Sequence, residues 1–162
     1  MLRYERLVKQ LARIPHDAFL MHGSVRRPHY GTLFPKQPRI IFPNNRDLTR
    51  RRVYATSVIP IAILYATIDL PSVRWDWRLI RDGKSLYLYC RIREEASLTD
   101  GYVHIVRRTG FEELRRRTIY SSRRRVRLHQ TIRVPAGILP WMLERGNVRI
   151  VREYPDIAAS RA

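Results

Sequence analysis

Apolar residues recur at helical spacing near the N-terminus of this chain and in short, strand-like runs further along. Residues 2–13 carry one apolar face and end before Pro15, which predicts an amphipathic helix. Residues 59–68 are apolar on nearly every side. We therefore expect a buried helix there, with Thr56 or Ser57 as its N-cap.

Short apolar runs bounded by turn residues predict a series of strands. In residues 126–134 every second side chain is expected on one shared face, and residues 111–116 are interpreted as one helical turn. A helix is predicted from Pro135 to Arg145, with Gly146 ending it. The turn signal Asp82-Gly83 predicts a hairpin between the strands 79–80 and 86–92, and the other expected strands are 18–21, 53–55, 102–106, 119–120, 126–134 and 148–151.

The order of these elements predicts the fold class. Helices fall mostly early in the chain and strands mostly late, which favours an α+β fold over a doubly wound parallel sheet. The length of 162 residues indicates one domain, assigned to residues 1–153, with a flexible C-terminal tail at 154–162. Residues 23–51 hold four prolines and predict a long loop, a kind of segment that more often serves function than not.

Cysteine and histidine are too sparse for several kinds of site. The single cysteine, Cys90, lies in an apolar run and is expected to be a buried small hydrophobe. One cysteine and five scattered histidines argue against a metal site, and the sequence fits a reducing, cytoplasmic compartment. No run approaches the roughly 18 apolar residues of a membrane span, so we expect a soluble protein that is not exported.

Charge is the most unusual feature of the composition. The net charge is +18, and 29 of the 32 basic residues are arginine. A GC-rich coding bias explains the ratio of arginine to lysine but not the excess of positive charge. A field of this sign attracts polyanions, and arginine pairs with phosphate and stacks on bases. Nucleic acid is the natural partner, although an acidic protein or an anionic membrane surface would feel the same field.

Two polar clusters at strand ends carry the candidate chemistry. The first is His22-Gly23-Ser24, interpreted as a turn in which glycine lets the backbone approach a ligand or adopt a positive φ. The second is the end of residues 53–57, Val-Tyr-Ala-Thr-Ser. His22 can donate a hydrogen bond to a ribose hydroxyl, and Ser24 adds another hydrogen bond. The alternative is a buried strand-end histidine satisfied by backbone carbonyl groups.

Together these clusters resemble ADP-ribosyltransferase-like proteins, in particular short bacterial and phage sequences. The resemblance spans about residues 18–134. It implies a split, antiparallel-rich central sheet with a few short helices and a cleft between its halves, in which NAD is bound as a substrate. The residues that carry it are His22-Gly23-Ser24, Leu33-Phe34-Pro35, Val53-Tyr54-Ala55-Thr56-Ser57, Ala62, Ala66, 101–106, Phe111 and Tyr120-Ser121.

The resemblance also implies roles for individual residues. His22, Gly23 and Ser24 would contact the ribose beside nicotinamide, and the second cluster would line the nicotinamide pocket through Tyr54, Thr56 and Ser57. Members of this family that are active place a glutamate late in the chain, where its charge stabilises an oxocarbenium-like transition state.

That glutamate has no clear counterpart here. Residues 118–125 contain no acid, and the candidates are Glu112 or Glu113, or Glu153 at the end of the last predicted strand. The predicted catalytic set is therefore His22, Tyr54 and Glu153. Either Glu153 serves as the stabilising acid, or the protein binds without transferring.

Arginine clusters predict a nucleic-acid surface. Several triplets packed on one domain repel one another, and a polyanion relieves that repulsion. Interleaved aromatic residues can stack on bases, at Tyr30, Phe34, Phe42 and Tyr120. Phosphate contacts of this kind position a nucleic acid without reading its sequence. The predicted nucleic-acid-binding residues are Arg50, Arg51, Arg52, Arg115, Arg116, Arg117, Arg123, Arg124 and Arg125.

Three functions follow from these interpretations. The first is an NAD-dependent mono-ADP-ribosyltransferase acting on an acidic substrate, most plausibly nucleic acid; the resemblance implies a toxin or a phage–host conflict factor. The second is a catalytically inactive, basic nucleic-acid-binding protein of the same fold. The third is an interaction protein that uses its arginine surface on an acidic protein partner.

Overall fold

The computed structural model describes residues 2–36, 50–69, 75–82, 85–92, 97–115, 117–146 and 148–151. They form an α+β structure with three α-helices, α1 (Leu2–Ala12), α2 (Ile59–Thr67) and α3 (Ile138–Glu144), and a short 3₁₀ helix, η1 (His29–Gly31). The strands in the described part are β1 (Phe19–Ser24), β2 (Thr32–Leu33), β3 (Val53–Thr56), β4 (Trp75–Asp82), β5 (Ser85–Ile92), β6 (Gly101–Arg107), β7 (Glu112–Arg115), β8 (Ile119–Ser122), β9 (Val126–Val134) and β10 (Val148–Val151).

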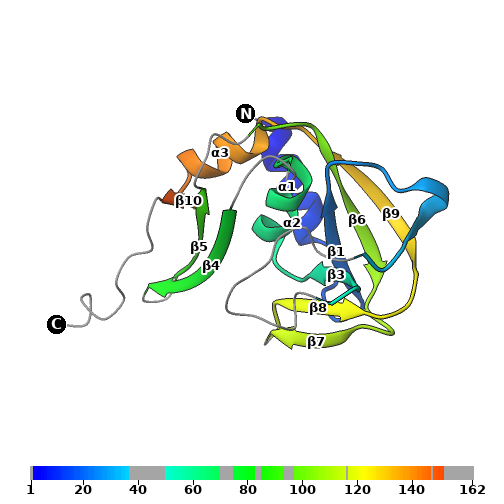
Figure 1. Ribbon diagram of the computed structural model, residues 1–162. Helices are drawn as coiled ribbons and strands as arrows, with labels where there is room; N and C mark the ends of the chain where they lie inside the picture. The colour runs from blue at the N-terminus through cyan, green and yellow to red at the C-terminus, as the bar shows by residue number, and fades with distance from the viewer. Residues whose placement is uncertain are drawn as a thin grey trace.

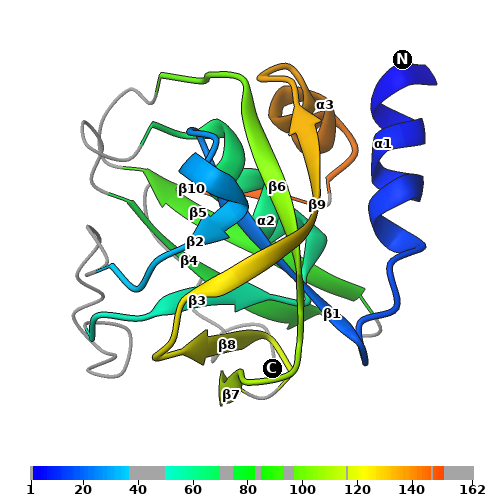
Figure 2. The same ribbon diagram turned by 90° about the vertical axis from the view of Figure 1, so that its right-hand side faces the viewer.

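Seven of these strands form one antiparallel sheet in the order β2-β9-β6-β1-β3-β8-β7 (Figures 1 and 2). Strand β1 pairs with β6 over its whole length, but it meets β3 at a single position, Met21 opposite Thr56. The sheet therefore consists of two well-paired halves joined by one rung, and this split lies between β1 and β3.

A second, three-stranded sheet has the order β10-β5-β4, and helix α2 lies between it and the large sheet (Figure 1). The main core contains residues of α1, α2, α3 and both sheets, among them the thiol-bearing Cys90. Helix α2 is buried along most of its length because apolar elements cover it on several sides. Its burial was expected from the sequence, since an all-apolar helix has no solvent face.

The other face of the large sheet has its own smaller core, which contains Leu20, Leu33, Val53, Ala55, Val106 and Tyr120. Segment 32–36 crosses this face: β2 pairs with β9 at one side, and Lys36 forms an antiparallel bridge with Arg52 next to β3 (Figure 2). The segment thus links the two halves of the split sheet a second time.

Sequence periodicity predicted many elements correctly. Both early helices, the β4–β5 hairpin, strands β6 and β8 to β10, and the positive-φ glycine after α3, Gly146, are as expected. Residues 154–162, predicted as a tail, lie outside the described residues. The N-cap prediction was wrong: the cap residue of α2 is Val58, without a side-chain cap, although its N–H donates to the Thr56 hydroxyl.

Two further predictions were wrong because strand pairing overrode local pattern. Residues 111–116 do not form a helical turn, since Glu112–Arg115 is strand β7 paired with β8. Strand β9 does not keep one apolar face, because Ile105 pairs with Gln130 and Val106 with Leu128, which leaves His129 as a bulge. Before the bulge, Val126 and Leu128 pack on the smaller core. After it, Ile132 and Val134 pack on the main core.

Candidate functional site

His22 spans the split of the large sheet. If the pairing of Met21 with Thr56 continued, Gly23 would face Tyr54, but no further rung forms. The His22 Nδ1 atom lies 2.7 Å from the Tyr54 carbonyl oxygen, so the imidazole takes the place of the missing rung. The structure thereby brings together the two polar clusters that the sequence separates by thirty-two residues. It also corrects the predicted turn, because His22, Gly23 and Ser24 all lie within β1.

The environment of His22 favours a neutral ring. Burial lowers the pKa of His22, the hydrogen bond to the Tyr54 carbonyl raises it, and the positive charge of Lys36 lowers it further. A carbonyl oxygen can only accept, so the Nδ1 atom carries the proton. The Nε2 atom is then an unprotonated acceptor, available to a hydroxyl or N–H donor that enters the split.

A row of aromatic rings continues from His22 onto the neighbouring strand. His104 on β6 lies opposite His22 in register, with ring centroids 6.1 Å apart, and Tyr102 stacks on His104 at 6.0 Å. The buried His104 Nδ1 pairs with the Thr131 hydroxyl at 3.0 Å, while its Nε2 atom has no hydrogen-bond partner among the described residues. Burial lowers the pKa of His104 to about 4, with the nearby His22 ring and Arg27 adding to the shift and the Arg26 backbone opposing it.

Gly23 serves packing. A Cβ atom at Gly23 would collide with the backbone of α2, at the Ala62 carbonyl oxygen and the Ala66 nitrogen. Gly101, on the neighbouring strand β6, meets the same helix at the Ala66 carbonyl. The two glycines therefore let α2 lie directly on the sheet beneath the split, and the expected approach of Gly23 to a ligand is replaced by an approach to this helix.

The hydroxyl groups predicted to line the pocket hold the protein's own backbone. Thr56 donates to the Thr118 carbonyl at 2.7 Å, Ser57 to the Arg117 carbonyl at 2.5 Å, and the Tyr54 hydroxyl to the Arg50 carbonyl at 2.7 Å. Ser24 donates to the Arg26 carbonyl at 2.8 Å. These bonds fix the chain on both sides of the split. A ligand would have to use the remaining lone pairs of these hydroxyl oxygens, or replace the bonds to the carbonyl groups.

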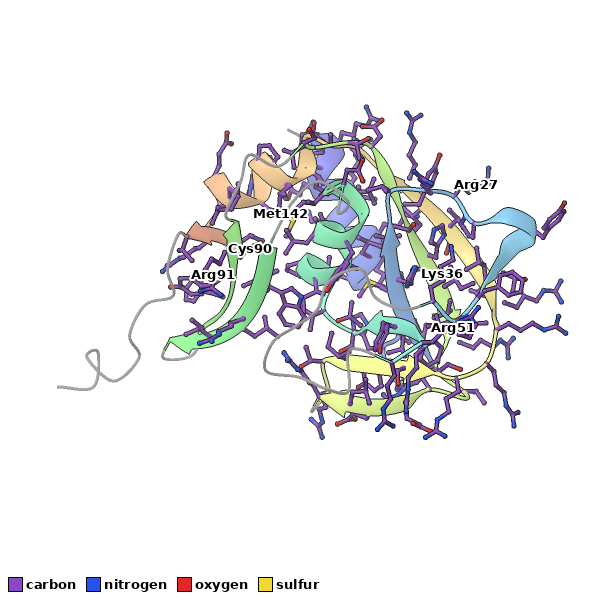
Figure 3. All side chains as sticks on the ribbon, viewed as in Figure 1. Arg27, Lys36, Arg51, Cys90, Arg91 and Met142 are labelled. Carbon is purple, nitrogen blue, oxygen red and sulfur yellow. The ribbon has the colours of Figure 1, made fainter. Side chains whose placement is uncertain are left out.

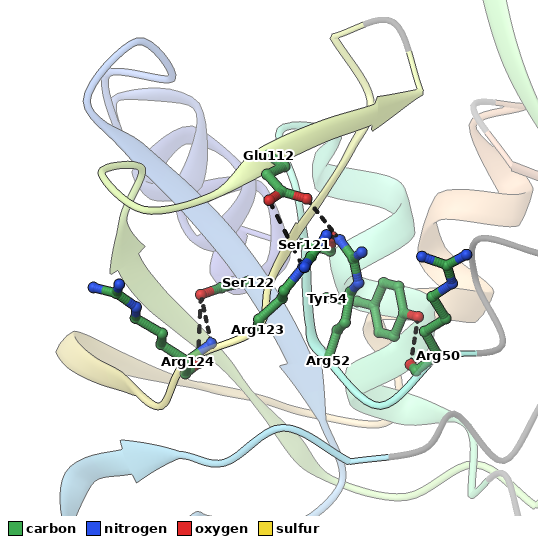
Figure 4. Close-up of polar contacts among 8 residues, drawn as sticks. All are labelled: Arg50, Arg52, Tyr54, Glu112, Ser121, Ser122, Arg123 and Arg124. Carbon is green, nitrogen blue, oxygen red and sulfur yellow. Dashed lines mark hydrogen bonds and ion pairs between the residues drawn. The ribbon is translucent and has the colours of Figure 1, made fainter.

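An arginine inside the sheet organises the second half of the split (Figure 4). The Arg52 Nη1 atom donates to Glu112 Oε2 and to Ser121 Oγ, each at 2.8 Å. Only 7% of Arg52 is exposed, so it is not the nucleic-acid contact that the sequence predicted. Glu112 also lies 3.9 Å from Arg123 Nε. This carboxylate, one of the candidate acids, is thus committed to structural ion pairs.

The other candidate acids differ in position. Glu113 accepts a hydrogen bond from the Arg117 backbone N–H at 3.0 Å and lies 3.7 Å from Arg108. Glu153, the third candidate, lies outside the described residues. Among the described residues no group of three or more potential metal ligands gathers.

Some of the residues predicted to bind nucleic acid are exposed, and others are buried or packed against other side chains. Arg115 lies over the ring of Trp77 at 5.5 Å, and Arg116 is outside the described residues. Tyr120 is not available to stack on bases, because it is 2% exposed and covered by Arg108. Phe42 lies outside the described residues. The exposed members are Arg50, Arg51, Arg117, Arg123, Arg124, Arg125, Tyr30 and Phe34.

Two hollows formed by described residues lie away from the split. One, of about 460 Å³, is lined by residues 17–19 and 107–111, and the other, of about 470 Å³, lies between α1 and the end of β9. Neither includes His22 or Tyr54. The pairing of His104 with His22 was not predicted, because only the β1–β6 register reveals it.

Comparison with protein-family models, with curated proteins and with solved structures finds no match to this chain. Within the described residues no helix is long and apolar enough to cross a membrane. The features that bear on function are therefore the geometry of the split, the charge of the surface and the resemblance carried by the short motifs.

Proposed function

We propose that this chain is an ADP-ribosyltransferase-like protein that binds NAD at the split between β1 and β3 and acts on an acidic, nucleic-acid substrate. The observation that carries the proposal is the His22–Tyr54 hydrogen bond across a sheet divided into two halves. A split central sheet with a histidine on one side and the Val-Tyr-Ala-Thr-Ser strand on the other is the arrangement that the resemblance implies.

His22 has a defined part in this proposal. Its Nδ1–H is occupied by the Tyr54 carbonyl, so the ring would accept a hydrogen bond from a ribose hydroxyl through Nε2. The sequence had suggested that the ring donates, and the observed bond reverses that role. A neutral ring suits the task, because a protonated imidazole would carry two donors and no acceptor.

The proposed reaction breaks the bond between the nicotinamide nitrogen and C1′ of the ribose. The bonding electrons leave with nicotinamide, and a nucleophilic atom of the acceptor forms the new bond to C1′ and releases its proton. Glu153 is the proposed stabiliser of the developing positive charge. Tyr54 holds the strand in place through its hydroxyl and offers its carbonyl to His22.

A second candidate function is nucleic-acid binding without transfer, and one observation favours it. Glu112, whose carboxylate lies in the second half of the split sheet, is held by Arg52 and flanked by Arg123. A carboxylate paired in this way has less charge to offer a cationic transition state. Under this candidate the fold and the basic surface serve binding alone.

The test is NAD consumption, followed by transfer of label from NAD onto RNA, DNA and protein. We expect turnover by the natural chain and its loss in His22→Ala, with turnover retained in His129→Ala, which removes an exposed histidine on β9. Thermal unfolding shows whether each variant is folded. Absence of turnover in the folded natural chain, together with salt-sensitive nucleic-acid binding, would establish the second candidate instead.

A further inference from the structure

The β2–β9 pair has one face inside the protein and one in solvent. Leu33 and Val126, which are paired, pack on the smaller core. Because strand side chains alternate, the neighbouring pair of Thr32 and Arg127 points outward. One further step of the same register places Phe34 opposite Arg125. Both of these residues are exposed.

Two exposed aromatic side chains flank β2 in the chain, Tyr30 in η1 before it and Phe34 directly after it. Tyr30 is 99% exposed and Phe34 is 53% exposed. Tyr30 also has φ 57°, a left-handed conformation that costs a residue with a side chain on the order of 1 kcal/mol. Exposing an aromatic ring to solvent and holding its backbone in a strained conformation each cost free energy. Features that carry such costs are typical of recognition surfaces.

The same outer side is strongly basic. Arg124, Arg125 and Arg127 are exposed, and the Arg124 N–H donates to the Ser122 hydroxyl, which fixes the turn into β9. Arg51 lies beside them, since its Nε atom donates to the Pro35 carbonyl at 3.0 Å. In Figure 3, nitrogen-tipped side chains project outward on the side of the molecule where Lys36 and Arg51 are labelled.

Few negative charges compensate this face. Residues 119–131 contain no aspartate or glutamate, and the neighbouring Glu112 is paired with Arg52 and Arg123. We define the β2–β9 face as Tyr30, Phe34, Arg124, Arg125 and Arg127. It combines cations for phosphates with ring faces for bases, and that combination is typical of proteins that bind single strands.

We propose that the β2–β9 face binds single-stranded nucleic acid, with Tyr30 and Phe34 stacking on bases and the three arginines on phosphates. A duplex buries its base faces and would leave the two rings without a role. An acidic protein would use the arginines alone. The inference rests on the proposed function in taking nucleic acid as the substrate, but it requires no NAD chemistry.

The first experiment measures binding of a short fluorescent oligo(U) and oligo(dT) by anisotropy, with a duplex of the same length as comparison. We expect the single strands to bind more tightly than the duplex. The double variant Tyr30→Leu/Phe34→Leu should weaken single-strand binding roughly 5- to 100-fold, because stacking on an aromatic ring is lost. Tyr30→Phe/Phe34→Tyr retains both rings and should bind like the natural chain.

The second experiment distinguishes binding at the β2–β9 face from a general effect of the protein's net charge. Arg125→Gln/Arg127→Gln and Arg3→Gln/Arg6→Gln remove the same charge, but the latter pair lies on exposed positions of α1. Only the first pair should flatten the dependence of log K on log salt, by about 0.7 for each lost phosphate contact. Equal effects of the two pairs would overturn the assignment to this face.

Ultraviolet crosslinking of the natural chain to oligo(U) requires no substitution and covers the case of variants that fail to fold. Crosslinked peptides should include Tyr30 or Phe34, and crosslinks confined to other segments would overturn the proposal. So would equal affinity for duplex and single strand, or leucine variants that bind like the natural chain. Single-strand binding without NAD turnover would refute the transferase proposal and leave this inference standing.

Discussion

The imidazole of His22 joins the two halves of the large sheet, with Nδ1 2.7 Å from the carbonyl oxygen of Tyr54. The main chains of β1 and β3 share only one rung, so this side-chain bond adds a further link between these two strands. The same bond orients the ring whose Nε2 atom would meet a ligand that enters the split. Stability and ligand binding are linked at this residue.

His22→Ala should lower the free energy of unfolding by about 1–3 kcal/mol, because it leaves the partly buried Tyr54 carbonyl without its donor. Urea unfolding followed by circular dichroism measures the change. His129→Ala is the control, since His129 is exposed and should cost less. Equal losses in the two variants would show that the cross-split bond contributes little.

Acid should destabilise the protein through His104. Burial lowers the pKa of His104 from 6.5 to about 4 in the folded state, so the unfolded chain binds its proton more readily. Stability is therefore fully present above pH 6.5 and falls as the pH drops toward 4. The loss from this residue should be about 3 kcal/mol, and His22, whose pKa is lowered too, acts in the same direction.

Urea unfolding at a series of pH values tests this expectation. His104→Gln, which is neutral throughout, should flatten the decline between pH 6.5 and 4, although its overall stability is lower because the bond to Thr131 changes. His129→Asn should keep the full decline. A natural chain with constant stability over this window would contradict the assigned burial of a neutral His104.

Gly23→Ala should disrupt the fold rather than a ligand contact. The new methyl group would meet the Ala62 carbonyl and the α2 backbone, which cannot move as a flexible side chain can. We expect a loss of about 3 kcal/mol or more, or failure to fold. Gly110→Ala is the comparison, because Gly110 has φ 86° but open space around it and should cost only about 1–2 kcal/mol.

Sequence patterns predicted the elements whose signal is local. The face of α1, the all-apolar α2 and the Asp82-Gly83 hairpin each carry their signal within a few neighbouring residues. Strand β7 has no such signal, since Glu112–Arg115 lacks alternation and its state is decided by pairing with β8. For the candidate site, the sequence singled out the His22 and Tyr54 clusters, which the structure brings side by side.

The rest of the site depends on register between strands far apart in the sequence. His104 faces His22 only because β1 and β6 pair antiparallel with this particular offset. Arg52 looked like one member of a surface triplet, yet it lies directly before β3, bridged to Lys36, and its guanidinium points inward to Glu112 and Ser121. The bulge at His129 likewise moves the apolar side chains of β9 from one face of the sheet to the other, whereas strict alternation predicts that they share one face.

Glu112→Gln should destabilise the protein because it removes the carboxylate that compensates the buried Arg52. Glu112 itself is 58% exposed, so the loss should be about 2 kcal/mol, below that of a fully buried pair. Glu5→Gln, which breaks the exposed pair with Lys9 on α1, should change the stability much less, because solvent screens that pair.

Both variants are compared by urea unfolding, alongside the NAD consumption assay. A structural Glu112 predicts lower stability, with any residual turnover in proportion to the folded fraction. Unchanged stability with complete loss of turnover would instead identify Glu112 as the missing catalytic acid and refute its structural role.

Tyr30→Gly should separate stability from binding. Glycine adopts φ 57° without strain, and the exposed ring contributes little packing, so the free energy of unfolding should stay within about 1 kcal/mol of the natural value. Single-strand affinity should fall roughly fivefold or more because one stacking platform is lost. Thermal unfolding and anisotropy with oligo(U) provide the two readouts. A variant that loses stability by several kcal/mol would show that the Tyr30 ring supports the fold. The position of the ring would then be explained without a role in binding nucleic acid.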